Sequence, residues 1–380
     1  MKYTLIISFI FAISVHARRQ RPLQDATNPG QNRYICDECV PKELIQAPGI
    51  GFDLSSSYAT VAIRYPNQTI VDVGRFNGSE EYADLLVRLG PPYVYNGPPF
   101  DTISDRIRYD LEQASRKWRK LRGLPSTTDI ELFSSFLINV TDFASYSLDT
   151  PVTRVAISLP DLPNLSYEDW EEVVQLTGLD VLKSYRFHQQ RLRELNVAWV
   201  GLGHGVCEHW RDSERCDKEE RSMEKRVVLA LSFTEERLSI SKAFVSGASE
   251  IYVATQVSRQ DLGYLSWRSN PENETFWDSV GMYVGTVART DRGFVIQDLI
   301  LTGEHAEEKN FLDAVWKALG DVTDVQKLWQ PLQVPGFDAE FVAARGAAEL
   351  AKRWQAEPPY GCMEGDWCKD DGGPDVKQEL

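Results

Sequence analysis

The sequence predicts an α/β protein in which mixed sheets are flanked by helices. Two β-rich runs at residues 59–64 and 69–76 are separated by a turn cluster and have the pattern of a β-hairpin. A strand at 153–159, a helix at 166–175 and a short strand at 181–182 follow one another, and this order implies parallel pairing through a helical crossover. A chain of 380 residues, 42% hydrophobic, has enough apolar material for two lobes.

The other elements are expected where apolar periodicity alternates with turn residues. Residues 90–99, rich in Pro, Gly and Tyr, predict a loop, and residues 102–121 predict a charged amphipathic helix. Further predicted elements are helices at 133–146, 309–319 and 338–354, a second hairpin at 227–231 and 237–243, and a strand at 294–301.

The N-terminal segment has the pattern of a signal peptide. Lys2 precedes an apolar run at residues 5–15, and Ala17 supplies a small residue for cleavage, so residues 1–17 are expected to be removed. An uncleaved anchor is the alternative, but this run is short for a bilayer core of about 30 Å. Residues 18–47 are polar and predict an extension that carries a cysteine pair.

Two further features predict passage through the secretory pathway. Five asparagines head N-x-[ST] triplets, the acceptor pattern for N-glycans: Asn67, Asn77, Asn139, Asn164 and Asn273. Residues 355–380 form an acidic tail whose last four residues, K-Q-E-L, resemble the K-D-E-L retrieval signal. We therefore expect a protein of the endoplasmic reticulum lumen or a secreted protein, with no transmembrane segment after signal cleavage.

Six cysteines in an oxidising compartment predict disulfide bonds. The candidates are Cys36, Cys39, Cys207, Cys216, Cys362 and Cys368. The middle two are close enough in sequence to close a local loop. The outer four allow either a clasp that joins the two tails or two short local loops.

Two other cysteine chemistries are weaker interpretations. His204, Cys207, His209 and Cys216 carry zinc-ligand atoms, but their spacing matches no familiar zinc pattern. The pair within residues 36–39 has redox-motif spacing, yet it lies in a polar extension rather than at a helix N-terminus after a strand. A structural disulfide is favoured in both places.

The formal net charge of −15 bears on partners. It would repel phosphate backbones, and no cluster of basic residues interleaved with aromatic ones is dense enough to override it. We expect no nucleic-acid partner.

One segment resembles the first phosphate motif of the heat-shock-seventy chaperone family. Residues 51–58 read G-F-D-L-S-S-S-Y and are followed by a β-rich run. In such a motif an Asp at a strand end organises hydrated magnesium, and a turn of small residues lets hydroxyls and N–H groups approach phosphate. The matching positions are Asp53, Ser56, Ser57 and Tyr58, while Ser55 replaces a glycine.

Further segments follow in the family's order. Residues 155–160 and 177–182 resemble the first connecting region, although residues 184–190 replace its N-E-P-T-A-A-A segment. Residues 298–303 are similar to the adenosine motif, with Glu304 where its second glycine belongs, and residues 342–348 resemble the closing helix.

The resemblance extends in patches over residues 48–352. It implies a two-lobed, actin-like (ribonuclease H-like) ATPase fold around a central cleft, with lobe I at 48–224 and lobe II at 225–354. It also implies that ATP or ADP, with magnesium held through water by Asp53, would meet residues of both lobes. These residues are Asp53, Ser55, Ser56, Ser57, Tyr58, Thr302, Gly303 and Glu304.

The second phosphate motif departs from the family. Within residues 230–237 the magnesium-organising Asp has become Ala230, and the glycine turn has become Ser232, Phe233 and Thr234. We expect side chains to fill the space where phosphate would enter, which weakens triphosphate binding and misplaces the attacking water. The segment at 243–293 also looks shortened, and no substrate-binding domain follows.

Three hypotheses follow. The leading one is a chaperone-like pseudo-ATPase of the secretory pathway that binds nucleotide weakly or not at all and serves as an interaction scaffold for a protein partner or co-chaperone. The second is a slow magnesium-dependent ATPase in which Asp53 acts with Glu235 or Glu236. The third is a secreted binding module that retains only the fold. No catalytic residue is assigned.

Overall fold

The computed structural model describes residues 34–93, 97–184, 191–290, 293–320, 322–329, 336–358, 362–365 and 368. The chain divides into a larger unit, Pro41–Glu357, and a smaller unit that combines Met1–Val40 with Pro358–Leu380. In the smaller unit, β1 (Tyr34–Ile35) pairs in parallel with β12 (Cys362–Met363).

A disulfide joins the two chain ends within the smaller unit. Cys39 and Cys368 are 329 residues apart in sequence, and their Cα atoms are 5.5 Å apart. Beside this bond, the Val40 N–H donates to Glu364 Oε1 at 2.8 Å. Cys36 is also disulfide-bonded. The predicted clasp between the tails is thus confirmed for Cys39, and a local loop at this cysteine is wrong.

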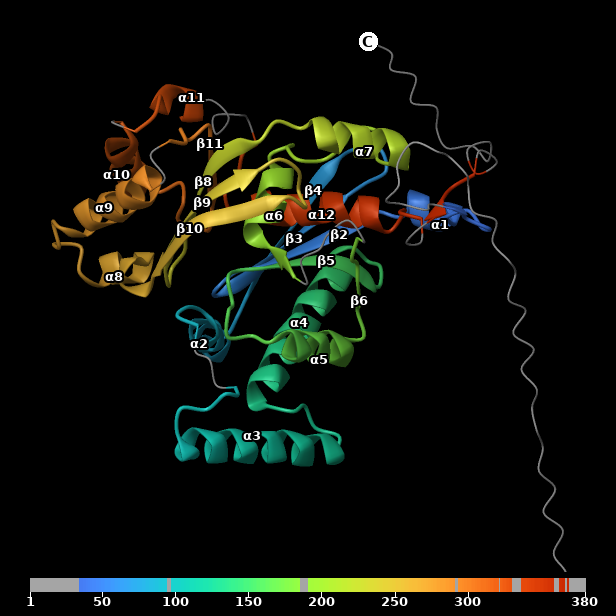
Figure 1. The fold of residues 1–380 in the computed structure, drawn as a ribbon, viewed down its shortest axis with the longest axis horizontal. Helices are drawn as coiled ribbons and strands as arrows, with labels where there is room; N and C mark the ends of the chain where they lie inside the picture. Colours follow the sequence, from blue (N-terminus) through green and yellow to red (C-terminus); the bar gives the residue numbers. More distant parts are fainter. Residues whose placement is uncertain are drawn as a thin grey trace, which may run out of the picture. The chain divides into compact units, whose positions relative to one another are not determined.

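The first sheet of the larger unit has six strands in the order β4-β3-β2-β5-β6, with β7 beside β5 (Figure 1). Its strands are β2 (Gly49–Leu54), β3 (Tyr58–Arg64), β4 (Ile70–Asn77), β5 (Arg154–Leu159), β6 (Asp180–Val181) and β7 (Leu192–Arg193). Strands β2, β3 and β4 are antiparallel, which confirms the first predicted hairpin. Strands β5 and β6 are parallel, as the predicted crossover requires.

Three helices pack on one face of this sheet, and the apolar side chains between the helices and the sheet form a hydrophobic core. They are α2 (Glu80–Leu89), α4 (Thr128–Ser147) and α5 (Tyr167–Thr177). Each begins at a Ser or Thr whose side chain accepts a hydrogen bond from a first-turn N–H, which satisfies a donor that the helix itself leaves free. Their apolar side chains pack on the sheet around Phe52, Tyr82, Phe133 and Trp170.

The second sheet has four strands in the order β10-β9-β8-β11. They are β8 (Arg226–Phe233), β9 (Leu238–Val245), β10 (Ile251–Arg259) and β11 (Asp298–Thr302). Strands β8 and β9 form the second predicted hairpin, and β11 joins β8 in parallel. On the outer face lie η1 (Gln260–Leu262), α8 (Tyr264–Ser269), α9 (Phe276–Arg289), α10 (Lys309–Leu319) and α11 (Val325–Trp329).

Two helices pack between the sheets. Helix α12 (Val342–Trp354) lies on β2 and β3, and α6 (Glu194–Gly201) packs against α12 and the second sheet. The helices approach so closely that a Cβ at Gly346 would stand 1.8 Å from the carbonyl oxygen of Val197. A side chain larger than hydrogen therefore has no room at this crossing.

The remaining helices of the larger unit are peripheral. They are α1 (Lys42–Gln46), α3 (Ile103–Leu121) and α7 (Ser213–Ser222). The predicted local disulfide, Cys207–Cys216, closes the loop that enters α7. No helix within the described ranges is long and apolar enough to cross a membrane.

Candidate functional site

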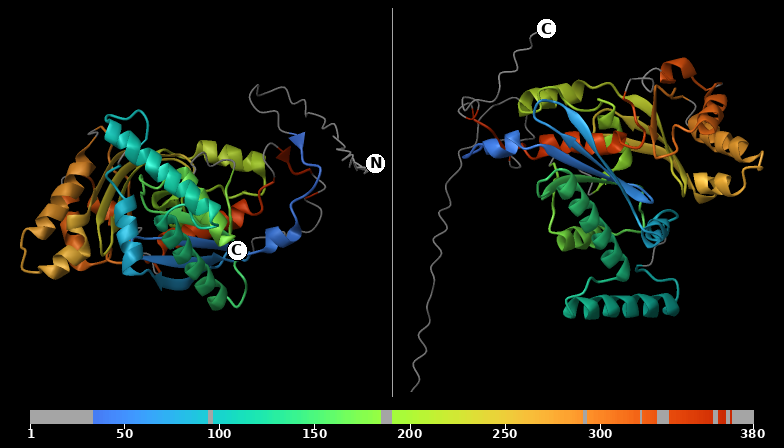
Figure 2. Two further views of the ribbon diagram at one scale, coloured as in Figure 1. Left: turned by 90° about the horizontal axis from the view of Figure 1, so that it is seen from below. Right: turned by 180° about the vertical axis from the view of Figure 1, so that it is seen from behind.

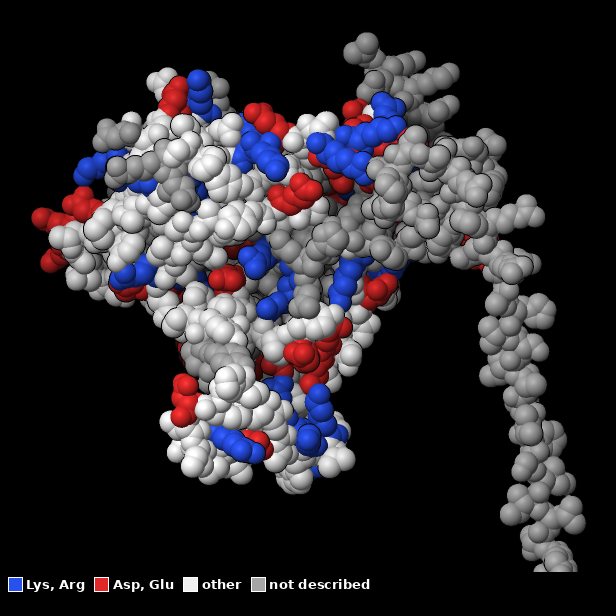
Figure 3. All heavy atoms as spheres, viewed as in Figure 1, with Lys and Arg blue, Asp and Glu red and all other residues white. Residues whose placement is uncertain are grey.

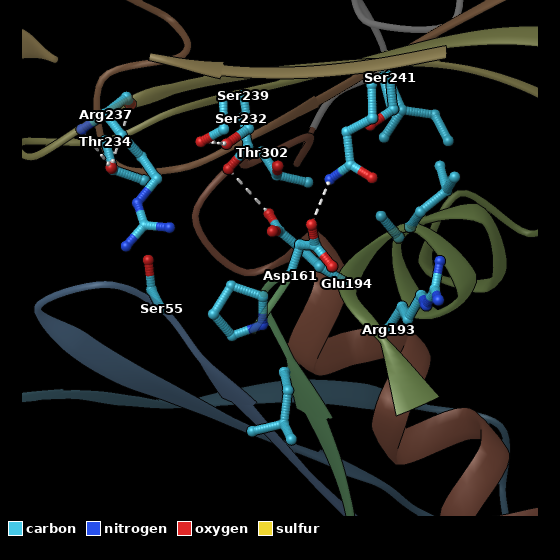
Figure 4. Close-up of a pocket in the computed structure, with 18 of the residues that line it drawn as sticks. Ser55, Asp161, Arg193, Glu194, Ser232, Thr234, Arg237, Ser239, Ser241 and Thr302 are labelled. Atoms are coloured by element: carbon cyan, nitrogen blue, oxygen red, sulfur yellow. Dashed lines mark hydrogen bonds between the residues drawn. The ribbon is translucent and has the colours of Figure 1, made fainter. Parts of the chain in front are cut away.

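A cavity of about 80 Å³ lies between the two sheets, where β5, β8 and β11 end near the β2–β3 turn (Figure 4). Its wall includes Ser55 and Ser56 from that turn, Glu194 from the start of α6, and Thr302 from the end of β11. Residues far apart in the sequence therefore meet at one place in the molecule.

Asp53 lies near the end of β2, opposite Ser158 on the parallel neighbour β5. The Ser158 hydroxyl donates to Asp53 Oδ1. The carboxyl group is buried, and burial together with the nearby charge of Glu194 raises the pKa of Asp53 from 3.8 to about 8. At neutral pH the group is therefore largely protonated.

Glu194 supplies a carboxyl group to the wall of this cavity, and the sequence hypotheses did not include it. The Ser232 hydroxyl donates to Glu194 Oε1 at 3.1 Å, and Thr302 also hydrogen-bonds this side chain (Figure 4). Burial raises the pKa of Glu194, an effect that these hydrogen bonds partly offset. Glu194 in the cavity wall and the buried Asp53 near it are thus two interacting acidic groups that both resist ionisation.

The β2–β3 turn reaches across to the second sheet. Ser56 Oγ donates to Glu236 Oε2 at 2.5 Å and lies 3.1 Å from Thr234 Oγ1. The turn itself closes through a hydrogen bond of 2.8 Å from the Ser55 N–H to the Tyr58 carbonyl. Ser56 therefore links the two sheets through the chain's own side chains.

The β8–β9 turn differs from the sequence expectation. Ser232 and Phe233 are the last residues of β8, and the turn is closed by the Thr234 N–H, which donates to the Arg237 carbonyl at 3.0 Å. Phe233 points into the core, where its ring stacks on Phe311 with centroids 4.4 Å apart. The expectation that Phe233 fills the space where phosphate would enter is wrong, because its ring lies in the core. The side chain that reaches the β2–β3 turn is the Glu236 carboxylate.

The residues of the predicted adenosine motif lie at the end of β11 and just after it. Thr302 lines the cavity, whereas Gly303 turns the chain with φ +96° against the Phe233 backbone. Glu304 Oε1 accepts a hydrogen bond of 2.9 Å from the Glu235 N–H, and burial raises the pKa of Glu304 to about 7.

Of the predicted site residues, Ser55, Ser56 and Thr302 line the cavity. Tyr58 is buried and is not one of the lining residues; the Arg75 guanidinium carbon lies 4.0 Å from its ring centroid. The Ser57 carbonyl accepts from the Gly78 N–H at 2.7 Å, so this backbone group serves the fold.

The carboxylates proposed to assist Asp53 have other partners. Glu235 binds Arg268 at 2.7 Å and His305 at 2.8 Å, and Glu236 binds Ser56. The carboxyl group whose charge acts on Asp53 is Glu194 instead. Of the segment expected to replace the family's N-E-P-T-A-A-A, residues 185–190 lie outside the described residues.

The residues around this cavity do not fit a nucleotide in this conformation. Sites for such ligands usually enclose about 300–1,000 Å³, several times the volume here. Glu236 also occupies the space between the two turns with a negative charge. A polyphosphate would meet this carboxylate at the point where donors are needed.

Metal ligands are also scarce among the described residues. The one group of three that lies close enough is Cys207, Cys216 and Glu220, and its two cysteines form a disulfide. His204 stacks on Trp199, with centroids 4.3 Å apart. The alternative of a zinc site at these residues therefore lacks the thiolate ligands that it requires.

The predicted glycosylation sites differ in accessibility. Asn67, Asn77, Asn139 and Asn273 are exposed. Asn164 is half-buried, and its amide donates to the Gly90 carbonyl at 2.7 Å. Four sites are thus open to modification of the folded chain.

Comparison of the chain with protein-family models and with curated proteins finds no match.

Proposed function

We propose that this chain is a chaperone-like protein of the secretory pathway, in which a degenerate actin-like nucleotide-binding domain serves as an interaction scaffold. The observation that carries the proposal is the contact between Ser56 and Glu236. It joins the two turns that the family resemblance assigns to phosphate binding.

The charge of this region supports weak or absent binding of ATP and ADP. The Glu236 carboxylate lies between the two turns. A bound triphosphate would add negative charge beside it, and like charges repel. Burial raises the pKa values of Asp53, Glu194 and Glu304, which disfavours the ionised form that would hold magnesium. Ala230, which lines the cavity, offers no carboxylate for magnesium.

The compartment is supported by independent features. Disulfides form and persist in oxidising compartments, and the structure contains Cys39–Cys368 and Cys207–Cys216. The predicted signal peptide, the exposed N-x-[ST] triplets and the K-Q-E-L ending suit the same pathway.

Calorimetric titration of the purified mature chain with ATP and with ADP, each with and without magnesium, tests the proposal. We expect no binding heat at millimolar nucleotide. A Glu236→Ala variant is the matched probe, because it removes the carboxylate between the turns and should bind more tightly than wild type. Micromolar binding by the wild type would overturn the pseudo-ATPase assignment.

A slow magnesium-dependent ATPase is the second candidate. Asp53 and Glu194 are neighbouring carboxyl groups, and together they could hold a divalent cation after losing their protons. Magnesium-dependent phosphate release above that of an Asp53→Ala control would favour this activity. Release equal to the control would exclude this mechanism.

A secreted binding module is the third candidate. Removal of the last four residues distinguishes it from a retained lumenal protein. If K-Q-E-L retains the chain, the truncated protein should appear in the medium while the intact protein stays inside the cell. Secretion of both forms would favour the binding module.

A further inference from the structure

Helix α3 (Ile103–Leu121) turns an apolar stripe toward solvent. None of its residues is buried. The stripe consists of Ile103, Ile107, Leu111, Trp118 and Leu121, whose exposed fractions lie between 55% and 86%. At 3.6 residues per turn these five positions fall on one face of the helix. A continuous apolar face of this kind on a soluble unit indicates an interaction surface.

The opposite face of α3 holds the helix on the larger unit through charge. The ion pairs are Arg116–Asp169, Arg119–Glu131 at 2.8 Å and Lys120–Glu172 at 2.7 Å. An amphipathic helix usually turns its apolar face to the core. Helix α3 has the opposite orientation: its charged face contacts the unit and its apolar face meets solvent. Its orientation leaves the stripe free to meet a partner.

Basic side chains border the stripe on both sides. By helical angle, Arg106 and Lys117 flank one edge, and Arg108 and Arg122 flank the other. The guanidinium carbon of Arg122 lies 4.5 Å from the Trp118 ring centroid. Arg106 pairs with Asp110 at 3.9 Å and Arg108 pairs with Asp105 at 3.5 Å. The excess positive charge along the stripe therefore comes from Lys117 on one edge and Arg122 on the other, in a chain whose net charge is −15. In the view of Figure 3, Lys and Arg lie beside Asp and Glu along the edge that α3 forms.

The bordering charges favour one class of partner. Pairing with the same stripe of a second copy would bring basic edges together, which is unfavourable. An anionic surface would instead complement both edges at once. Figures 1 and 2 show α3 as an outlying helix of the larger unit, and its 19 residues give a rod of about 28 Å. An outlying rod can lie along a flat surface without a clash from the rest of the unit.

We propose that α3 docks on the surface of a bilayer that contains anionic lipids. The apolar stripe enters the boundary between headgroups and acyl chains, and the flanking Lys and Arg side chains reach the lipid phosphates and carboxylates. A strongly charged helix with a well-separated apolar face is the type that lies in the interface rather than spanning the bilayer. This docking does not depend on what the cavity between the sheets binds.

Flotation of the full mature chain with lipid vesicles tests the proposal. The vesicles contain equal parts of phosphatidylserine and phosphatidylcholine, or phosphatidylcholine alone. The wild type should float with the anionic vesicles, float much less with the neutral ones, and be partly released by added salt. Failure to float with anionic vesicles at low salt overturns the proposal.

Variants separate the apolar and ionic contributions. The double variant Trp118→Ser, Leu121→Ser should bind anionic vesicles at least about tenfold more weakly, because two large apolar groups no longer enter the interface. The double variant Lys117→Gln, Arg122→Gln should lose about fivefold per charge on anionic vesicles and little on neutral ones.

A matched control is Met282→Ser on α9, since this side chain is 57% exposed on another helix. It should float as the wild type does. Thermal unfolding should be unchanged in all variants, because none of the substituted residues is buried. Equal flotation of the stripe variant and the wild type refutes the proposal. If the wild type does not float but self-associates, and the stripe variant does not self-associate, the membrane proposal is refuted and the partner of the stripe is a second copy of this chain.

Discussion

Replacement of Asp53 by Asn should make the stability of this protein less sensitive to pH. The carboxyl group is buried at the end of β2, and its pKa rises from 3.8 to about 8. Asn has nearly the same shape and keeps an oxygen that can accept from the Ser158 hydroxyl. The substitution therefore removes the titration and leaves the packing in place.

The sign follows from proton binding. Between about pH 4 and pH 8 the folded state holds a proton on Asp53 that the unfolded state has lost, so the free energy of unfolding falls as pH rises. One such group contributes about 1.4 kcal/mol per pH unit. Between about pH 5 and pH 7 the wild type should lose about 2.7 kcal/mol from this group, and Asp53→Asn should lose none of it.

Urea unfolding followed by circular dichroism at several pH values across this range measures the difference. Glu194 and Glu304 also have raised pKa values. Because the wild type and Asp53→Asn both contain these groups, the difference between the two pH slopes reports on Asp53 and on its electrostatic interaction with them. Asp278→Asn, which changes an exposed carboxylate, should leave the slope unchanged. A slope that is equal in wild type and Asp53→Asn, or an Asn variant that is less stable at neutral pH, would refute the reasoning.

Two further predictions concern contacts inside the larger unit. Ser56→Ala removes the hydroxyl that donates to Glu236 and should lower the free energy of unfolding by about 1.5–3 kcal/mol. A double-mutant cycle with Glu236→Gln should show a coupling energy of about 1 kcal/mol or more. Additive effects of the two substitutions would contradict a direct bond. Gly346→Ala places a Cβ against the Val197 carbonyl and should cost about 3 kcal/mol or more; a melting temperature like that of the wild type would show that α6 and α12 are not so close.

The elements that the sequence predicted are those with strong local signals. Both hairpins alternate β-rich runs with turn residues, and the two strands of each are neighbours in the sequence. Helix α5 begins at Ser166, whose side chain caps the first turn, and Gly178 follows its last turn with φ +70°. Such signals are contained within a few residues and need no knowledge of the rest of the chain.

The elements that the sequence did not reveal have weaker local signals. Helix α6 is only eight residues long and buries most of its residues, so no amphipathic period marks it. Segment 243–293, which we expected to be shortened, contains the whole of β10 together with α8 and α9. Periodicity alone cannot distinguish short or well-buried elements of this kind.

The candidate site was predicted in part for the same reason. Asp53 and Ser56 were found because they lie in one contiguous motif. Glu194 was missed, since it meets Asp53 only through the packing of α6 between the sheets. The position of Phe233 depends on the β8–β9 register, in which Phe233 pairs with Leu238, and this register moves the turn beyond the residues expected.

Hydrogen bonds between side chains on either side of the cavity hold this part of the larger unit together without a ligand. Besides Ser56 with Glu236, the Arg237 guanidinium donates to the Leu86 carbonyl at 3.1 Å, and Gln256 donates to Asp161 at 3.2 Å. Side chains thus make the links that a bound ligand could otherwise supply. Opening the cavity would deprive the buried Arg237 guanidinium of the Leu86 carbonyl, which costs about 1–3 kcal/mol. The exposed Gln256–Asp161 bond would be replaced by bonds to water at little cost. We therefore infer that the chain acts through its outer surfaces, of which α3 is the one that the distribution of apolar and basic side chains marks for binding.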